Sequence, residues 1–183
     1  APDIVLFGEY GGSYAYGSKV TLPSAAAGDV LDPNVRFTLS VTDPDGKPCV
    51  ATDGTEITGV APGRFEIELS AKGAYRVVYE AADTFGGRTA SVTFLITSAD
   101  TKPPVLQFGA EWITAAKINE KYVFPKIETT DDLGGATVYI SVSAPTGKTQ
   151  TLPAGTDSLI FTTAGRYRIT VLAIDESGNA ASY

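Results

Sequence analysis

Histidine and methionine are absent from this chain of 183 residues, and cysteine occurs once, as Cys49. Without histidine the chain cannot form a Ser-His-Asp or Cys-His catalytic arrangement, and it offers no imidazole ligand to zinc. A single cysteine excludes an internal disulfide and a cysteine-rich metal site, so we interpret Cys49 as a free thiol. Because any catalysis would depend on carboxylate, lysine or tyrosine side chains alone, we expect no enzyme activity, no cofactor and no bound metal.

Positive charge is also scarce, with 14 Lys and Arg against 21 Asp and Glu and a net charge of -7. Phosphate binding needs clustered basic side chains, and these are scattered, so the composition disfavours nucleic acid as a partner. No apolar run approaches the roughly 20 residues that span a bilayer, so we expect no direct membrane insertion. Hydrophobic residues at 43% are enough to bury a core, which predicts a globular chain.

One long motif is present twice. GRYRITVLAIDESGN, Gly165–Asn179, repeats GAYRVVYEAADTFGG, Gly73–Gly87. Other matching blocks follow in the same order in both halves: LFGEY (6–10) with QFGAEW (107–112), KVTLP (19–23) with KYVFP (121–125), and VRFTLSVTDPDGK (35–47) with ATVYISVSAPTGK (136–148). An unchanged order of blocks indicates a tandem duplication of one module.

The two copies are joined by SADTKPPVL, residues 98–106, whose consecutive prolines favour an extended, semi-rigid connection. We place the boundary near Lys102, which predicts a first domain of residues 1–101 and a second of residues 102–183. The first copy carries extra residues that the second lacks. We expect them to form a loop over about residues 48–64.

Hydrophobic residues alternate with polar ones within each copy. RFTLSV (36–41), TVYISV (137–142) and RFEIELS (64–70) each place apolar side chains on one face, as a strand with one buried face requires. Turn sequences such as DPDGK, APTGK and ESGN separate these segments at the spacing typical of an all-β sandwich. The fold class that we predict is all-β, with two tandem immunoglobulin-like β-sandwich domains joined by a short Pro-rich linker.

Six residues of the repeated motif receive structural roles in this fold. The tyrosines lie near the start of strand F, where a tyrosine corner bonds its hydroxyl back to the backbone. The aspartates open the next turn and accept hydrogen bonds from backbone amides, and the glycines allow a positive φ there. These residues are Tyr75, Tyr167, Asp83, Asp175, Gly86 and Gly178.

The last strand differs between the copies. RTASVTFLITS (88–98) follows the motif in the first copy, whereas only AASY follows it before Tyr183 in the second. We therefore expect strand G of the second domain to be short, and we expect the natural chain to continue beyond Tyr183.

Aromatic residues in a Gly-rich stretch are the candidate ligand-binding site. Tyr10, Tyr14 and Tyr16 occur in EYGGSYAYG, and Trp112 is the counterpart of Tyr10 in the second copy. Such rings can stack on sugars, which makes a carbohydrate contact one hypothesis. Exposed aromatic residues are also common on ordinary surfaces, and the alternative is packing.

Acidic loops raise a second hypothesis, a calcium site. Asp43 and Asp45 lie in one turn and Asp131 and Asp132 in another, but Gly54 stands where an EF-hand starting at Asp43 would need glutamate. A looser site built from loops that meet in space stays open. The favoured interpretation is that these aspartates bond to their own backbone.

A third hypothesis is an isopeptide bond between lysine and asparagine in the second copy. Lys121, Asn179 and Asp175 supply the necessary residue types. The first copy retains Lys19 but has Gly87 where the asparagine would lie, so the same strand arrangement forms there without the bond. We therefore disfavour it.

The ordered motifs resemble a known family. Pro-x-(Ile/Val)-x-x-Phe-Gly, Lys-x-x-x-Pro, a strand ending in Pro-x-Gly-Lys, and Gly-x-Tyr-x-(Val/Ile)-x-x-x-Ala-x-Asp-x-x-Gly-Asn look like the bacterial Ig-like repeats of secreted or surface-anchored multidomain proteins. The first copy departs from the pattern at residues 85–87, where Gly-Gly replaces Gly-Asn. The resemblance implies an extracellular or cell-surface location in a bacterium and a structural role beside enzymes or adhesins.

From these observations we expect a monomeric, non-catalytic spacer module pair whose partners are neighbouring domains of the same natural chain. The alternative function is a carbohydrate- or protein-binding module of the adhesin type, acting through the loops of the first domain on a glycan or a cell-surface protein.

Overall fold

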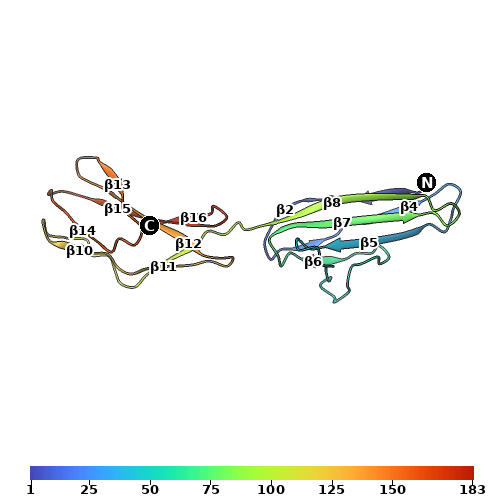
Figure 1. The fold of residues 1–183 in the computed structure, drawn as a ribbon, viewed down its shortest axis with the longest axis horizontal. Helices are drawn as coiled ribbons and strands as arrows, with labels where there is room; N and C mark the ends of the chain where they lie inside the picture. The colour runs from blue at the N-terminus through green and yellow to red at the C-terminus, as the bar shows by residue number, and fades with distance from the viewer. The chain divides into compact units, whose positions relative to one another are not determined.

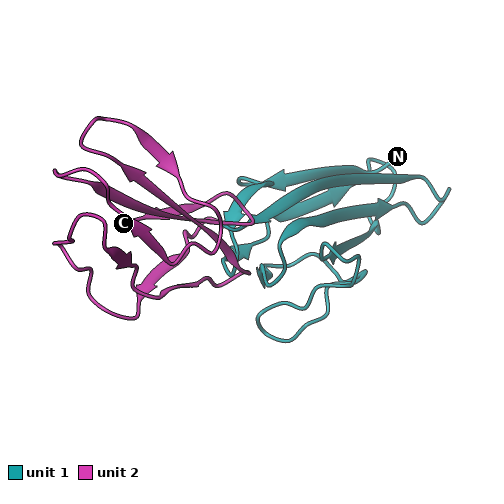
Figure 2. Ribbon diagram, turned by 60° about the vertical axis from the view of Figure 1, so that its left-hand side comes forward, with its two compact units in different colours: residues 1–100 teal, residues 101–183 magenta.

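A computed structural model describes residues 1–183, which separate into two compact units, Ala1–Asp100 (unit 1) and Thr101–Tyr183 (unit 2) (Figure 2). All the regular elements are β-strands (Figure 1). No helix is present with the length and hydrophobicity needed to cross a membrane. The two units are described separately below.

Unit 1 contains eight strands. They are β1 (Asp3–Phe7), β2 (Gly12–Ala15), β3 (Lys19–Thr21), β4 (Ser24–Gly28), β5 (Arg36–Thr42), β6 (Glu66–Glu68), β7 (Gly73–Ala82) and β8 (Thr89–Ala99). One layer is a four-stranded sheet in the order β2-β8-β7-β5, in which β2 is parallel to β8 and the other neighbours are antiparallel. The second layer consists of the pairs β1-β4 and β3-β6. This arrangement is consistent with a β-sandwich.

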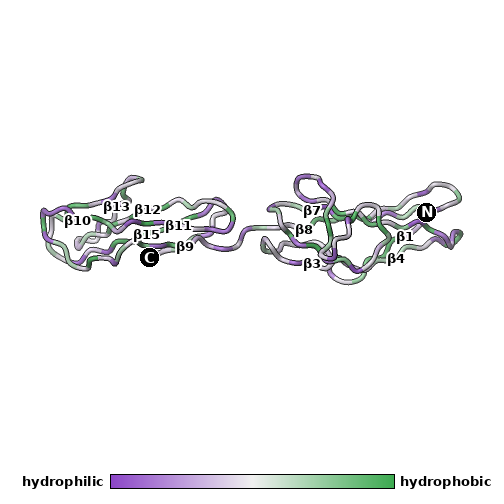
Figure 3. Tube along the Cα trace, turned by 90° about the horizontal axis from the view of Figure 1, so that it is seen from below, coloured by the Kyte–Doolittle hydropathy of each residue, from purple (hydrophilic) through white to green (hydrophobic).

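The core of unit 1 lies between these layers because alternate residues of each strand point inward. Along β7 the pattern is regular, with Tyr75, Val77 and Tyr79 at most 2% exposed. Leu39 and Val41 of β5 are fully buried beside them. Figure 3 shows the same division along the trace, with apolar residues in the strands and polar residues concentrated in the loops.

The extra segment of residues 48–64 contains isolated β-bridges and no strand, and it contributes side chains to the core of unit 1. The Leu39 amide donates to the Val60 carbonyl at 2.7 Å, and the Val41 amide donates to the Ile57 carbonyl at 2.9 Å. Ile57 itself is fully buried and Cys49 is nearly so. Burial of one isoleucine side chain contributes about 1.5–3 kcal/mol, so the segment stabilises the sandwich that it covers.

Unit 2 also contains eight strands. They are β9 (Val105–Phe108), β10 (Lys121–Val123), β11 (Ile127–Thr130), β12 (Ala136–Ser143), β13 (Thr149–Thr151), β14 (Ser158–Ile160), β15 (Arg168–Asp175) and β16 (Ala180–Ser182). One layer has the order β13-β12-β15-β16, and the other consists of the pairs β9-β11 and β10-β14. The pairing β9-β11 matches β1-β4, β10-β14 matches β3-β6, and β12-β15 matches β5-β7.

The two units differ at one edge. In unit 1, β8 pairs with the full length of β7, from Gly73 to Ala82. In unit 2, β16 pairs with β15 only at residues 172–174, and the Val171 and Tyr183 backbones exchange two further hydrogen bonds. No strand of unit 2 is found in the place of β2. Because β16 and Tyr183 reach only as far as Val171, residues 168–170 of β15 have no strand partner on the edge opposite β12.

Candidate functional site

The tyrosines of the Gly-rich stretch pack against their own unit. The Tyr10 ring lies 5.3 Å from the Phe94 ring, centroid to centroid. Tyr14 belongs to β2, and its hydroxyl donates to the Gly11 carbonyl at 3.4 Å. The Tyr16 amide donates to the Ala99 carbonyl at 2.8 Å, and its side chain is half-buried. Tyr10 and Tyr14 remain 56% and 38% exposed, so these contacts leave both rings accessible on the surface of unit 1.

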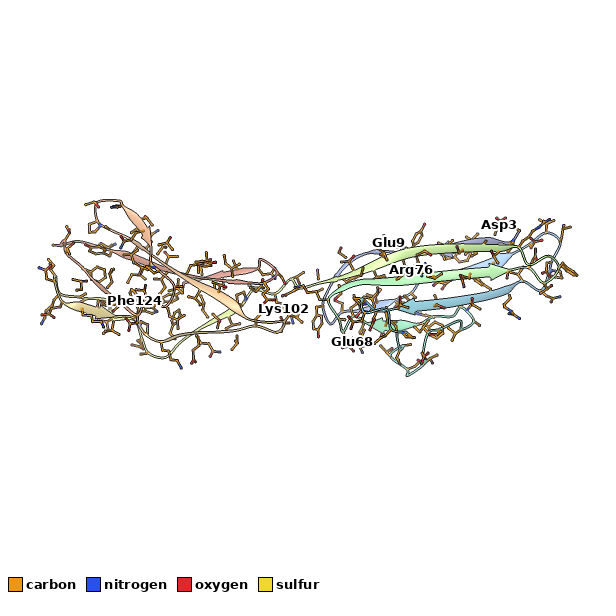
Figure 4. The ribbon with its side chains drawn as sticks, viewed as in Figure 1. Asp3, Glu9, Glu68, Arg76, Lys102 and Phe124 are labelled. Carbon is orange, nitrogen blue, oxygen red and sulfur yellow. The ribbon has the colours of Figure 1, made fainter.

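Trp112 belongs to unit 2, so the structure does not join it to these tyrosines in one site. Its ring lies 5.6 Å from Phe108 and 5.9 Å from Phe124, and it stacks on Tyr183 at 5.9 Å with an interplanar angle of 20°. Phe124, labelled in Figure 4, follows β10 and is 6% exposed. The Trp112 indole nitrogen Nε1 is buried and has no hydrogen-bond partner.

Beside Trp112 lies a groove of about 550 Å³, which we call the aromatic groove. Its aromatic and aliphatic walls include Trp112, Ile118, Tyr122, Phe161, Tyr167 and Tyr183. This volume is within the range of ligand pockets, and an apolar lining with a few polar groups is typical of binding sites. Arg166 supplies the one charged side chain in the lining. The groove is the best candidate for a functional site, and the sequence indicated only Trp112 and Tyr167 of these residues.

The two tyrosines predicted to form corners do bond to backbone four residues earlier. The Tyr75 hydroxyl accepts a hydrogen bond from the Ala71 amide at 2.7 Å, and the Tyr167 hydroxyl donates to the Thr163 carbonyl at 3.1 Å. Burial raises the pKa of Tyr75, and the Ala71 amide partly offsets this effect. Each tyrosine therefore stabilises the turn that leads into the central strand of its unit, β7 in unit 1 and β15 in unit 2.

The predicted turn aspartates also bond to their own turns. Asp83 Oδ1 accepts from the Gly86 and Arg88 amides at 2.8 and 3.2 Å. Asp175 Oδ1 accepts from the amides of Ser177 and Asn179 at 2.8 and 2.9 Å. Burial alone would raise the pKa of Asp175, but hydrogen bonds from the Asn179 side chain and backbone and from the Ser177 amide lower it below its usual range.

One of the glycine roles was wrong. Gly178 has a φ of 90°, as the turn after Asp175 was predicted to need. In unit 1 the positive φ is found at Gly87, at 66°, and not at Gly86. The unit 1 turn is one residue longer, since the Asp83 amide donates to the Arg88 carbonyl and the Asp175 amide donates to the Asn179 carbonyl, so the left-handed residue falls one position later.

The acidic loops take different partners in the two units. Asp43 Oδ1 accepts from the Asp45 and Lys47 amides at 2.9 and 2.8 Å, as the turn interpretation expects. Asp132 pairs with the Lys102 ammonium at 2.6 Å. Asp131 Oδ1 accepts from the Leu133 amide at 3.0 Å.

The second oxygen of Asp131 is unusual. Its Oδ2 is buried without a hydrogen bond, and the Asp131 and Asp175 carboxylates bring oxygens within 4.8 Å of each other. At the corresponding place in unit 1, Asp32 Oδ2 accepts from the Thr84 amide and hydroxyl at 2.5 and 2.9 Å. Both Asp32 oxygens therefore accept hydrogen bonds, whereas one Asp131 oxygen is buried near the Asp175 carboxylate without a hydrogen bond.

The residue types suggested for an isopeptide bond are engaged elsewhere. The Asn179 amide nitrogen donates to Asp175 Oδ2 at 2.9 Å. Lys121 is exposed on β10. A hydrogen bond from the Ser158 hydroxyl and, to a smaller extent, the charge of Lys121 lower the pKa of Asp157.

Cys49 is buried as well as unpaired. Burial, with a smaller contribution from Asp43, raises the pKa of its thiol to about 11. The thiol is therefore protonated at neutral pH and unreactive while unit 1 is folded, since the thiolate is the nucleophile.

No protein-family model matches the chain, and no curated protein matches it. Among solved structures, the chain is similar to fibronectin(III)-like modules of CbhA from Clostridium thermocellum, at 18% identity and a TM-score of 0.36, covering 98% of this chain and 89% of that chain. The fold described above therefore rests on the strand pairing of the chain itself.

Proposed function

We propose that this chain is a non-catalytic structural spacer of an exported bacterial surface or multidomain protein, with neighbouring domains of the natural chain as its partners. The observation that carries the proposal is the path of the backbone through unit 1. β2 is parallel to β8, so the chain enters the unit in the direction in which it later leaves it. A module whose chain enters at one end and leaves at the other keeps the domains before and after it apart.

The path can be followed in Figure 4, where the chain advances from Asp3 to Glu9 toward the end of unit 1 at which β8 leaves. β8 is the longest strand, at 11 residues, and it spans about 35 Å at the usual rise per residue. It is bonded to β7 on one side and to β2 on the other. Tension between the two ends of unit 1 therefore loads these hydrogen bonds in parallel.

Single-molecule pulling tests this role. Handles on Ala1→Cys and Thr101→Cys, in a Cys49→Ala background, load unit 1 along the spacer axis. Handles on Ser70→Cys and Thr101→Cys in the same background lie at one end of the unit and peel β7 from β8. We expect the unfolding force along the axis to be at least twice the peeling force. Equal forces in the two geometries would refute a load-bearing spacer.

Surface location is part of the proposal and has its own test. Antibodies against the chain should label intact cells of the source organism, or the culture medium should contain it. Detection only after lysis would contradict the exported location.

The alternative function, a carbohydrate- or protein-binding module acting through the loops of unit 1, has less structural support. Tyr14 and Tyr16 contact the β2-β8 edge, and the extra segment contributes Ile57 to the core. A glycan array probed with the full chain tests it directly. Binding that is lost on Tyr14→Ala would establish it over the spacer role.

A further inference from the structure

Three apolar side chains of unit 1 stand out by their exposure. Val30 and Leu31, in the loop between β4 and β5, are 99% and 81% exposed, and Phe85, in the turn between β7 and β8, is 78% exposed. They are the three most exposed large hydrophobic side chains of the chain, and all three line one groove. Exposed apolar residues that gather in one place mark interaction surfaces, whereas single ones are ordinary. We call these three residues the apolar tips.

The apolar tips are held in place by hydrogen bonds within their loops. The Leu31 amide donates to Asp29 Oδ1 at 2.8 Å. Asp32 follows Leu31, and its Oδ2 accepts hydrogen bonds from the Thr84 amide and hydroxyl. The loop is thereby bonded to the residue that precedes Phe85. Because these bonds fix the backbone before any partner arrives, binding at the apolar tips loses less conformational entropy.

Unit 2 has the two corresponding loops without the apolar tips. In the repeated motif, Ser177 stands at the position of Phe85. In the loop before β12, Leu133 is partly buried, and no residue of 131–135 is a strongly exposed large hydrophobic. The shared framework therefore forms without exposed apolar side chains at these loops, and the fold does not require them in unit 1.

The groove beside the apolar tips, which we call the loop groove, is acidic. It has a volume of about 880 Å³, and residues of β1 and β4 complete its lining. Its one basic side chain is Arg88, whereas four aspartates line it, namely Asp3, Asp29, Asp32 and Asp83. The Ala1 ammonium pairs with Asp29 at 3.3 Å, which leaves three carboxylates against Arg88. A surface with an excess of negative charge attracts cationic groups and repels anionic ones.

We propose that the apolar tips and the loop groove bind a partner protein that presents an apolar side chain flanked by Lys or Arg. The apolar tips supply the contact area, and the aspartates select the charge. A second copy of this chain is disfavoured by its own net charge of -7, and an anionic lipid surface is disfavoured by the same repulsion. This role is independent of the spacer function, and it moves the alternative protein-binding function away from Tyr14 and Tyr16.

The first test uses a phage-displayed library of random peptides, about twelve residues long, selected on the full chain. The selected peptides are then made synthetically and titrated against the chain and against the double variant Leu31→Ser, Phe85→Ser. We expect an apolar residue flanked by Lys or Arg in these peptides, and binding at least tenfold weaker to the variant. No enrichment, enriched peptides without basic residues, or equal binding to both proteins would refute the proposal.

A matched double variant controls for the loss of apolar surface. Val50→Ser, Leu95→Ser changes two side chains that are 55% and 51% exposed elsewhere in unit 1 and do not line the loop groove. We expect unchanged affinity for the selected peptides. The Cys49 thiol is buried in folded unit 1, so an unreactive thiol confirms that both variants are folded. Equal weakening by both variants would place the peptides elsewhere and overturn the proposal.

The role of charge is tested at Asp3, which is exposed on β1 and labelled in Figure 4. Asp3→Lys should weaken the selected peptides at least fivefold at low salt, and the loss should shrink as salt is added, because salt screens exposed charges. Glu68→Lys is the control, since Glu68 is exposed on β6 and does not line the loop groove. Equal weakening by both substitutions would show that the peptides respond to net charge alone, against the proposal.

Two further measurements compare the partner protein with other occupants. Vesicles of phosphatidylcholine, with and without phosphatidylglycerol, should not sediment the chain, and sedimentation velocity should give a monomer. Vesicle binding that is lost in the Leu31→Ser, Phe85→Ser variant would assign the apolar tips to a membrane surface. Dimerisation that is lost in this variant would assign them to a second copy of the chain, and either result would overturn the proposal.

Discussion

Units 1 and 2 share a strand framework but differ in how completely they bury a core. The main core cluster of unit 1 contains thirteen buried residues, whereas that of unit 2 contains four, namely Tyr122, Phe124, Val142 and Phe161. The motif that is repeated supplies the framework in both. Four of the nine additional buried residues, Cys49, Ala51, Ile57 and Ile96, lie in residues 48–64 and the second half of β8, and the other five lie in the shared framework.

The comparison indicates that the repeated residues specify the same strand order in both units, whereas the depth of burial differs both at repeated positions and through the extra segment. Two natural probes allow each unit to be followed separately. Trp112 emission reports unit 2, and the reactivity of the buried Cys49 thiol reports opening of unit 1. We expect unit 2 to unfold at the lower urea concentration.

The largest effect is expected from Ile57→Ala in the extra segment. Ile57 is fully buried, and removing a buried isoleucine side chain leaves a cavity that costs about 2–5 kcal/mol. The urea midpoint for Cys49 exposure should fall sharply, while the Trp112 midpoint stays unchanged. Val50→Ala is the control, since Val50 is 55% exposed in the same segment. A midpoint equal to that of Val50→Ala would show that the segment is only a surface loop.

Tyr79→Phe removes a hydrogen bond that unit 2 does not contain, since the repeat places Val171 at this position. The Tyr79 hydroxyl donates to the Pro23 carbonyl at 2.6 Å, and leaving this buried carbonyl without a partner costs about 1–3 kcal/mol. We expect the Cys49 midpoint to fall at neutral pH. Tyr139→Phe, at a residue 45% exposed on β12, should change nothing.

The same variant has a predicted pH dependence. Burial raises the pKa of Tyr79 to about 12. Its contribution is therefore complete below pH 10, where the unfolded tyrosine is also protonated, and is lost as the pH rises toward 12. Tyr79→Phe should show a shallower loss of unit 1 stability between pH 10 and 12, measured by urea unfolding. An unchanged slope would contradict burial of the hydroxyl.

Asp32→Asn should have a smaller effect on the same unit. A hydrogen bond from the Thr84 amide, with others from Asn34 and the Thr84 hydroxyl, lowers the pKa of Asp32. The stabilisation is present above the unfolded pKa near 4 and is lost as the pH falls through the lower folded value. The variant should lower the urea midpoint for Cys49 exposure at pH 7. It should also make this midpoint fall less steeply as the pH is lowered. Asp3→Asn, at an exposed position of β1, should do neither.

Much of the framework could be predicted from the sequence, because alternation and turn residues are local signals. Tyr75 and Tyr167 bond as expected for the same reason, since donor and acceptor lie four residues apart. The burial of Ile57 could not be predicted, because its neighbours come from a strand distant in sequence. The short strand beside β15 was predicted, but the aromatic groove was missed because its walls come from segments distant in sequence, around Trp112, Phe161 and Tyr183.

The contact between Asp131 and Asp175 is likewise invisible in the sequence, and it gives the smallest and most discriminating prediction. Asp131→Asn neutralises a carboxylate before β12, as Asp32→Asn does before β5, but we expect the opposite effect on stability. The substitution removes the Asp131 carboxylate, which has an oxygen within 4.8 Å of an Asp175 oxygen, and the new asparagine amide can donate to Asp175. The Trp112 midpoint should therefore rise slightly.

Salt identifies the cause of this rise. Repulsion between charges is screened by added salt, so the gain from Asp131→Asn should shrink between 0.05 and about 1 M NaCl, where the Debye length falls to about 3 Å. Asp132→Asn is the matched control on the adjacent residue, and it should lower the midpoint slightly because it removes the ion pair with Lys102. If Asp131→Asn lowers the midpoint as Asp32→Asn does, then Asp131 stabilises its loop as Asp32 does, and the difference between the units lies in their cores alone.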